Sequence, residues 1–359
     1  MPGKKHKPNR GLPTPIVLGG MAGVRIGVGA LAAPTWPITQ SFVRAAGCYY
    51  ATRSKNSKRL ERARGHLRVA FPEAGPERVD QLAIEAYQHL LLLGAEIARS
   101  PRTMSTDSVL RHVEFRGVEK GLNAIVSGRP CILMTGHCGN WEVLATTAAL
   151  LGIPMHAIYR PMEFEPLDNW IRRERSRPGV IMVDKFGAMH QLPKLMEQGA
   201  CPGFVADQNA GDRGVFVPYF GRLASSYKSI GLLALKFNAT IICGAAHRVP
   251  SPDGDTHYRF AIHDTFGPEE WSQHPDPVFY LTARYRRALE TAVREVPEQY
   301  LWMYRIWKSR PRHERLDKPF PDKLREHLRL LPWMTEDEAA RIEDRSERDR
   351  AILREGGMI

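Results

Sequence analysis

The feature that most constrains the fold is a change in the hydrophobic pattern near Val113. Beyond this residue, short apolar runs alternate with longer segments in which apolar residues recur at helical spacing. Such alternation is typical of an α/β domain whose mostly parallel or mixed sheet is flanked by helices. The predicted strands are Cys131 to Thr135, Met155 to Tyr159, Val180 to Val183, Gly203 to Ala206, Thr240 to Ala246 and Tyr258 to Phe266. The predicted helices between them are Asn140 to Leu151, Glu165 to Arg175, Ala188 to Glu197, Ser229 to Phe237 and Val278 to Val296.

Two further regions flank this pattern. Residues 60–71 and 74–102 are predicted helices on the amino-terminal side, and residues 335–355 form a charged helix that we expect to be solvated. The sequence therefore predicts a basic, membrane-associated segment over residues 1–50, one α/β domain over 51–320, and a charged helical tail over 321–359.

The charge balance indicates an anionic partner. Lysine and arginine exceed aspartate and glutamate by 12, and the isoelectric point is near 9.6. A nucleic acid, an anionic membrane surface and an acidic carrier protein would each fit such a charge. The chain contains no zinc-finger, RRM or KH signature, which argues against nucleic acid.

The segment from Leu12 to Trp36 is apolar and follows a basic run, as a membrane anchor would. Arg25 and several prolines interrupt it, so an interfacial helix and a single membrane pass both remain open. A cleaved signal peptide and a soluble buried helix are the alternatives. The five cysteines are odd in number and form no CxxC pair, which indicates a reduced compartment and favours the anchor.

A strand, a glycine-flanked turn and a helix follow one another from Leu133 to Glu142, where open α/β sheets place their ligands. His137 lies in the turn and Glu142 in the first turn of the helix. Glu142 would accept a hydrogen bond from Nδ1 of His137, leaving Nε2 as a general base. A buried histidine beside an unrelated helix-start glutamate is the alternative.

Three more polar positions are expected at the same edge. Arg160 follows the second predicted strand, and Asp207 follows the strand ending at Ala206, where it would position a hydroxyl or pair with Arg160. Arg175 extends a possible phosphate-binding surface, although a basic helix face explains it equally well. Cys138 adjoins His137, but a core thiol is the expected role.

Several motifs occur in one order along the chain. They are Phe71-Pro72-Glu73, His137-Cys138-Gly139-Asn140-Trp141-Glu142, Tyr159-Arg160-Pro161 with Leu167, Asp168, Ile171 and Arg175, Ala206-Asp207-Gln208, Gly214 to Gly221, Pro297 to Trp302, and Trp307-Lys308-Ser309-Arg310-Pro311. In this order they resemble the late acyltransferases of lipid A biosynthesis, in the lysophospholipid-acyltransferase-like superfamily, and the related phosphatidylinositol mannoside acyltransferases.

The resemblance implies a membrane O-acyltransferase that moves a fatty acyl chain from acyl carrier protein, or from acyl-CoA, to a hydroxyl of a glycolipid such as a lipid A precursor. It implies the cytoplasmic face of the cell inner membrane, with a peripheral or single-pass attachment. His137 and Glu142 would be catalytic, and Arg160, Asp207, Asn140 and Arg175 would bind substrate. Backbone N–H groups near Gly139 and Asn140, or Arg160, would stabilise the oxyanion.

Other classes remain open. A thioesterase or hydrolase would use the same dyad with water as acceptor, although the chain has no GxSxG elbow. A phosphatidylinositol mannoside acyltransferase and an inactive membrane-binding or carrier-binding homologue are further alternatives. The chain has neither HExxH nor a Cys/His cluster, so we expect no metal and no cofactor beyond the acyl donor.

Overall fold

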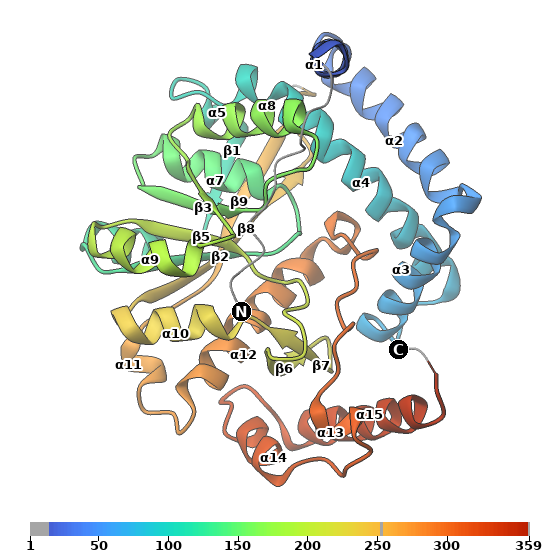
Figure 1. Ribbon diagram of the computed structural model, residues 1–359, viewed down its shortest axis with the longest axis vertical. Coiled ribbons are helices and arrows are strands. Elements are labelled where there is room, and N and C mark those ends of the chain that lie inside the picture. The colour runs from blue at the N-terminus through green and yellow to red at the C-terminus, as the bar shows by residue number, and fades with distance from the viewer. Residues whose placement is uncertain (1–13, 252–253, 358–359) are drawn as a thin grey trace.

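A seven-stranded sheet forms the centre of the molecule (Figure 1). The computed structural model describes residues 14–251 and 254–357, so the basic run between residues 4 and 10 lies outside the described residues. The strand order is β1-β9-β8-β2-β5-β3-β4; β8 and β9 pair antiparallel, and the other neighbours pair parallel. The strands are β1 (Val113–Arg116), β2 (Cys131–Thr135), β3 (Met155–Tyr159), β4 (Ile181–Asp184), β5 (Cys201–Val205), β8 (Thr240–Val249) and β9 (His257–Phe266).

Helices cover both faces of this sheet. The helices α6 and α7 pack on the face that carries Leu133, and α9, α10 and α12 pack on the face that carries Met134. The described helices are α1 (Thr14–Ala32), α2 (Trp36–Thr52), α3 (Ser57–Ala70), α4 (Pro76–Thr103), α5 (Val109–His112), α6 (Glu119–Val126), α7 (Trp141–Leu150), α8 (Glu165–Ser176), α9 (Ala188–Glu197), α10 (Lys228–Phe237), α11 (Pro268–Trp271), α12 (Pro277–Glu295), α13 (Arg312–Arg315), α14 (Asp322–Arg329) and α15 (Glu336–Arg354), with short 3₁₀ turns at Ser54–Asn56 and Pro297–Gln299. The predicted class, an α/β domain with a mostly parallel sheet flanked by helices, is confirmed.

The carboxyl ends of β2 and β5 form the edge that matters for function. Both strands are apolar and buried on their two faces, as central parallel strands require. Leu133 pairs with Gly203 and Thr135 pairs with Val205, so the two chains leave the sheet side by side. His137 and Asp207 follow directly after these strand ends.

A small second sheet was not predicted. The strands β6 (Val215–Tyr219) and β7 (Arg222–Ser226) form an antiparallel hairpin below the main sheet (Figure 1). Phe220 and Gly221 connect them with positive φ angles of 52° and 66°. This is the backbone of a two-residue hairpin turn, which a glycine tolerates readily and a phenylalanine does not. The sequence Phe-Gly is therefore a weak turn signal.

The amino-terminal segment forms two helices rather than one. Pro15–Ala32 in α1 has a mean hydropathy of 1.6, is long and apolar enough to cross a membrane, and is only 6% buried. Arg99 and Arg102 of α4 donate hydrogen bonds to the carbonyl oxygen of Ala32, which caps the end of α1. After residues 33–35 the chain continues as α2, which packs along α4 through Trp36 and other apolar side chains.

The carboxy-terminal helix α15 exists as predicted, but only part of it is solvated. Ala339, Ile342, Ser346 and Asp349 on one side of the helix are buried against the rest of the protein. The expectation that this helix is a solvated face is therefore wrong for that side.

Candidate active site

The turn between β2 and α7 is built by two residues. Gly139 has a φ of +60°, and a Cβ atom there would overlap the carbonyl of Ala246. Asn140 then caps α7, because its Oδ1 accepts hydrogen bonds from the N–H groups of Glu142 and Val143. The turn leaves the His137 side chain at the sheet edge and starts the helix immediately after it.

His137 is paired with Asp207. Its Nδ1 lies 2.7 Å from Oδ1 of Asp207, and its backbone N–H donates to Oδ2 of the same carboxylate over 2.9 Å. The Asp207 side chain is 1% exposed, whereas that of His137 is 15% exposed. The carboxylate is thus fixed inside the protein and holds the imidazole at the surface of the site.

Asp207 remains ionised despite its burial. Burial alone would raise its pKa, but the charge of His137, the two hydrogen bonds from His137 and the nearby Arg286 lower the pKa of Asp207 below its ordinary value. Arg286 is buried in α12, and its guanidinium donates to the carbonyl oxygen of Asp207 over 2.6 Å. An ionised carboxylate accepts hydrogen bonds only, so Nδ1 of His137 carries the proton.

The other imidazole nitrogen is therefore free to act as a base. Nε2 of His137 lies 3.3 Å from the side-chain amide of Gln208. The rings of Trp141 and Tyr304 flank the imidazole edge-on, with centroids at 4.8 and 5.2 Å. These contacts limit the imidazole to one orientation, in which a substrate hydroxyl would compete with Gln208 for Nε2.

The predicted hydrogen bond between His137 and Glu142 is wrong. Glu142 instead forms a two-armed ion pair with Arg175 of α8, with 2.7 Å between Oε2 and Nε, and it accepts a hydrogen bond from the Trp141 indole over 2.9 Å. Asn140 begins α7 only after the turn, so Glu142 projects from the helix towards α8. A catalytic role for Glu142 stays a prediction, but its contact is with Arg175.

The backbone donors expected near the helix start are also engaged. The N–H of Gly139 donates to Gln299, and the N–H of Asn140 donates to Ala246. The buried Asn140 amide donates to Glu96 over 2.6 Å. These bonds argue against both an oxyanion role for the two N–H groups and a substrate-binding role for the Asn140 side chain.

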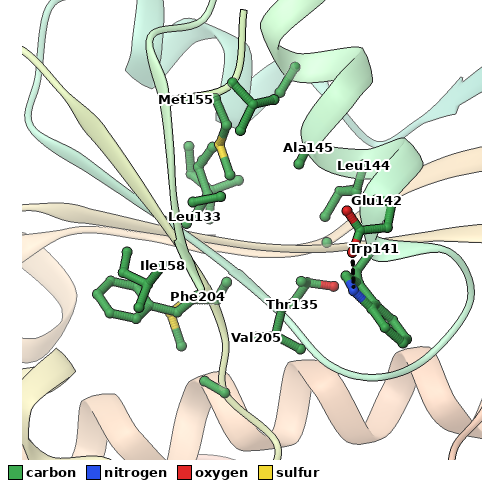
Figure 2. Close-up of a pocket in the computed structure, with 18 of the residues that line it drawn as sticks. Leu133, Thr135, Trp141, Glu142, Leu144, Ala145, Met155, Ile158, Phe204 and Val205 are labelled. Atoms are coloured by element: carbon green, nitrogen blue, oxygen red, sulfur yellow. Dashed lines mark hydrogen bonds between the residues drawn. The ribbon is translucent and has the colours of Figure 1, made fainter. Parts of the chain in front are cut away.

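His137 is one of the residues that line a large apolar cavity against the sheet. Figure 2 shows part of its lining. Its volume is about 500 Å³. Leu133, Thr135, Met155, Gly203 and Val205 contribute from the face of the sheet covered by α7, by the alternation of side chains along strands. In Figure 2, Leu144 and Ala145 of α7 lie across from Leu133 and Met155, with Glu142 and Trp141 at one end. This mostly apolar lining fits a hydrocarbon chain better than a polar substrate.

Several polar residues line the cavity together with His137. Arg160, at the carboxyl end of β3, is exposed and lines the cavity together with Arg175 and Glu142. The structure thus brings His137, Glu142, Arg160 and Arg175 to one cavity, and it places Asp207 behind His137. One expectation was that Asp207 would pair with Arg160, but Asp207 pairs with His137.

Cys138 lies in the core, as expected. It is buried, and burial raises the pKa of its thiol well above the ordinary value, so the sulfur is a neutral thiol. Within residues 14–251 and 254–357, no group of three or more His, Cys, Asp or Glu side chains is arranged to hold a metal ion.

Sequence reasoning missed Arg286 and gave Gln208 little weight. Arg286 falls on the same face of α12 as Thr282, Leu289 and Val293, and all four are buried. An arginine on the apolar face of an amphipathic helix was a usable signal, because a buried charge requires a partner. Gln208 adjoins Asp207 and offered no comparable signal.

Comparisons with known proteins show which proteins this chain is similar to. The family described as bacterial lipid A biosynthesis acyltransferase matches residues 18–309. A lipid A biosynthesis acyltransferase of Haemophilus influenzae is 24% identical over 264 residues, covering 71% of this chain and 78% of the relative. A lipid A biosynthesis lauroyltransferase of Escherichia coli is 27% identical over 249 residues (68% and 78%), and a palmitoleoyltransferase of the same organism is 24% identical over 253 residues (69% and 78%).

Proposed function

Because this chain belongs to the bacterial lipid A biosynthesis acyltransferase family, we propose that it transfers a fatty acyl chain from a thioester donor to a hydroxyl of a lipid A precursor. The donor is acyl carrier protein, with acyl-CoA as the alternative. The reaction takes place at the cytoplasmic face of the inner membrane.

The observation that carries the proposal is a histidine base in the wall of an apolar cavity. His137 is held by the ionised Asp207, and it lines the cavity together with Arg160 and Arg175. We place the acyl chain in the apolar part of the cavity, with its thioester carbonyl beside His137. A hydroxyl bonded to Nε2 would then lie next to the carbonyl carbon.

The transfer needs one base and no covalent enzyme intermediate. The hydroxyl gives its proton to Nε2 of His137 as its oxygen bonds to the thioester carbonyl carbon. The carbon–sulfur bond then breaks, and the imidazolium returns the proton to the departing thiolate. Asp207 stabilises the imidazolium that exists between these two steps.

Arg160 is the proposed donor to the oxyanion. It is a cation that lines the same cavity as His137, and the backbone N–H groups of Gly139 and Asn140 are already engaged. Glu142 holds Arg175, and we assign this pair to the anionic head of a substrate.

Two helices support attachment to a membrane. The apolar α1 is almost wholly exposed, and on α2 the side chains of Ile38, Phe42 and Tyr49 are 61%, 71% and 64% exposed. Positions 38, 42 and 49 fall on one side of a helix, given about 100° per residue. A soluble protein rarely presents such a stripe beside an exposed apolar helix.

The decisive experiment uses the full-length protein in micelles containing anionic lipid. Labelled acyl carrier protein and acyl-CoA donors are offered with lipid A precursors, with mannosylated inositol lipids, and without acceptor. His137→Ala is compared with His190→Ala, which removes an exposed histidine of α9. We expect transfer to lipid A precursors, at a rate that falls by at least about a hundredfold in His137→Ala and is unchanged in His190→Ala.

The other outcomes separate the alternatives. Donor hydrolysis without transfer would identify a thioesterase, and transfer to mannosylated inositol lipids alone would change the acceptor. Binding of lipid without either reaction would refute the enzymatic proposal.

A further inference from the structure

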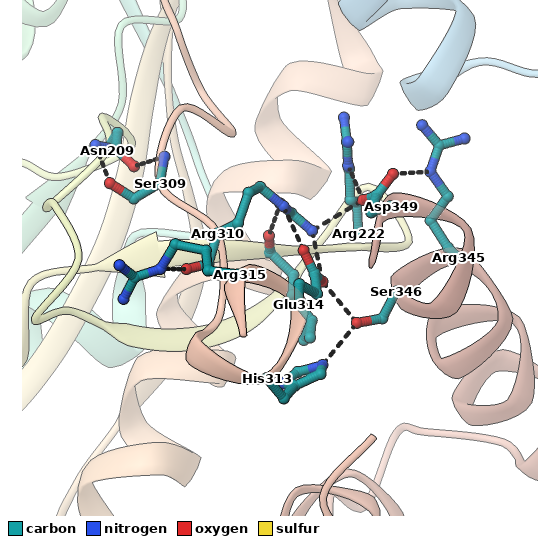
Figure 3. Close-up of polar contacts among 11 residues, drawn as sticks. Asn209, Arg222, Ser309, Arg310, His313, Glu314, Arg315, Arg345, Ser346 and Asp349 are labelled. Atoms are coloured by element: carbon teal, nitrogen blue, oxygen red, sulfur yellow. Dashed lines mark hydrogen bonds and ion pairs between the residues drawn. The ribbon is translucent and has the colours of Figure 1, made fainter. Parts of the chain in front are cut away.

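The carboxy-terminal helix α15 contributes a buried carboxylate to the interior of the protein. Asp349 is fully buried and lies between Arg222 of β7 and Arg310, at 2.6 and 2.9 Å from their guanidinium nitrogens (Figure 3). Residues 310–357 lie beyond the range matched by the family. The matched part of the chain therefore contains Arg222, whose carboxylate partner comes from outside it.

A buried arginine without its carboxylate is unfavourable, because its charge is then uncompensated. Arg310 has a second partner in Glu314, which also accepts a hydrogen bond from Ser346 of α15 over 2.6 Å. Asp349 thus connects Arg222, which belongs to a strand of the protein body, to Arg310. Through this connection α15 fixes the segment that begins at Ser309.

Ser309 is bonded to the loop that carries the active-site carboxylate. Its N–H donates to Oδ1 of Asn209 over 3.0 Å, and the Asn209 amide donates to Oγ of Ser309 over 3.2 Å (Figure 3). Asn209 lies two residues after Asp207, which holds His137. Asp349 is therefore connected to Asp207 through its ion pair with Arg310, the hydrogen bonds between Ser309 and Asn209, and the short stretches of chain that join these residues.

We propose that α15 is a brace for the active-site loop 207–212, and that Asp349 is a positioning residue for the His137–Asp207 pair. The proposal rests on the proposed function, because it assigns Asp349 an effect on the same reaction. Asp349 acts on the rate of the chemical step rather than on donor binding, because Asp349, Ser309 and Asn209 do not line the cavity.

The test compares Asp349→Asn with Asp344→Asn in the full-length protein. Asp344 is an exposed acid on the same helix, so it controls for charge and helix propensity. We expect Asp349→Asn to lower kcat by about tenfold to a hundredfold with little change in the donor KM, because a small misplacement of the base is costly. Amide hydrogen exchange across residues 207–212 should be at least about fivefold faster in Asp349→Asn and unchanged in Asp344→Asn.

A double-mutant cycle with Asn209→Ala tests the route. If α15 acts through Asn209, the kcat of the variant with both Asp349→Asn and Asn209→Ala should be no lower than that of the slower single variant. If the two changes act independently, their effects on kcat should multiply. Should Asp349→Asn fail to fold, Ser346→Ala takes its place in the cycle, because it loosens α15 without leaving a buried charge unpaired.

Two results would overturn the brace. One is hydrogen exchange of the loop at the wild-type rate in a folded Asp349→Asn or Ser346→Ala variant. The other is a double variant in which the effect on kcat of Asn209→Ala multiplies that of the change on α15. Hydrogen exchange does not depend on activity, so the brace is tested even if the wild-type protein transfers no acyl chain. Absence of transfer by the wild-type protein would count against the proposed function alone.

Discussion

At the scale of single residues, the partner of His137 decides the catalytic assignment. Asp207→Asn keeps the shape of the side chain but removes the charge that fixes the proton on Nδ1. We expect kcat to fall by about 10² to 10⁴ with a small change in KM. Glu142→Gln should cost about tenfold, because Glu142 contacts Arg175 and not the imidazole. Steady-state kinetics of the two variants would test this, and a larger loss in Glu142→Gln would reinstate the His137–Glu142 dyad.

A second residue, Met155, is placed to set the length of the acyl chain. Its terminal methyl lies where a side chain of Gly203 would be, inside the cavity. Gly203 pairs with Leu133 of β2, so the methyl lies two residues, or about 7 Å along the strand direction at a rise of about 3.3 Å per residue, from the level of Thr135. Met155→Ala should open room for about three more heavy atoms and shift donor preference to longer chains.

The matched control for Met155 is Met196, which is equally buried but does not line the cavity. Both alanine variants should lose about 2–5 kcal/mol of stability, but only Met155→Ala should change the profile across donors of different length. An identical shift in Met196→Ala would assign the effect to general loosening of the core.

The residues of the site were identified from sequence more successfully than their contacts. His137 and Asp207 were each predicted to lie at the same edge, because each follows an apolar strand. Their pairing was not predicted, since it depends on β2 and β5 being neighbours, and strand order is not encoded in local pattern. Glu142 was chosen as partner because it is near in sequence, and the turn at Gly139 sends it elsewhere.

At the scale of elements, the turn between β2 and α7 depends on Gly139. Gly139→Ala would place a methyl group against the Ala246 carbonyl in a backbone conformation that alanine disfavours. We expect a loss of about 2–4 kcal/mol in the free energy of unfolding, measured by urea titration, together with loss of activity.

Gly128 provides the control for this prediction. It also has a positive φ, of 73°, but a Cβ atom there would meet open space. Gly128→Ala should therefore cost only about 1 kcal/mol and leave activity unchanged. Equal losses in the two variants would show that backbone strain, and not the close approach to Ala246, governs the turn.

Elements with strong periodicity were predicted well. The bounds of β2 and β3 agree with the prediction residue for residue, because their apolar runs are bounded by clear turn residues. The strand β1 was missed because only Val113 of its four residues is buried, so it lacks an apolar run. The helix α2 was merged into the anchor, since its apolar residues continue those of α1 without a polar gap.

At the scale of the whole molecule, the charge pattern of the carboxy-terminal helix does not predict which of its acids is buried. The acids and arginines of α15 predict a solvated helix, and its exposed side agrees. Asp349 contacts Arg345 on its own helix, but its other partners, Arg222 and Arg310, lie 127 and 39 residues away. No local pattern distinguishes a carboxylate that will be buried by such distant partners from one that faces water.

The folded protein also holds several histidines neutral, and this predicts a loss of stability in acid. Burial lowers the pKa of His66 to about 4 and that of His247 to about 3, from an ordinary value of 6.5. Below pH 6.5 the unfolded chain binds protons that the folded protein does not. The contribution of these neutral histidines to the free energy of unfolding is therefore complete above pH 6.5. It is lost as the pH falls towards 4 for His66 and towards 3 for His247.

His66 allows this effect to be measured separately. Its Nδ1 lies 2.9 Å from the Trp302 carbonyl oxygen, a contact that a neutral imidazole makes as donor. Between pH 6 and 4.5 the free energy of unfolding of the wild type should fall more steeply than that of His66→Gln, by about 1.4 kcal/mol per pH unit. His190→Gln, at an exposed position, should keep the wild-type slope. Parallel slopes for the wild type and His66→Gln in urea titrations would mean that His66 is protonated in the folded protein as readily as in the unfolded chain.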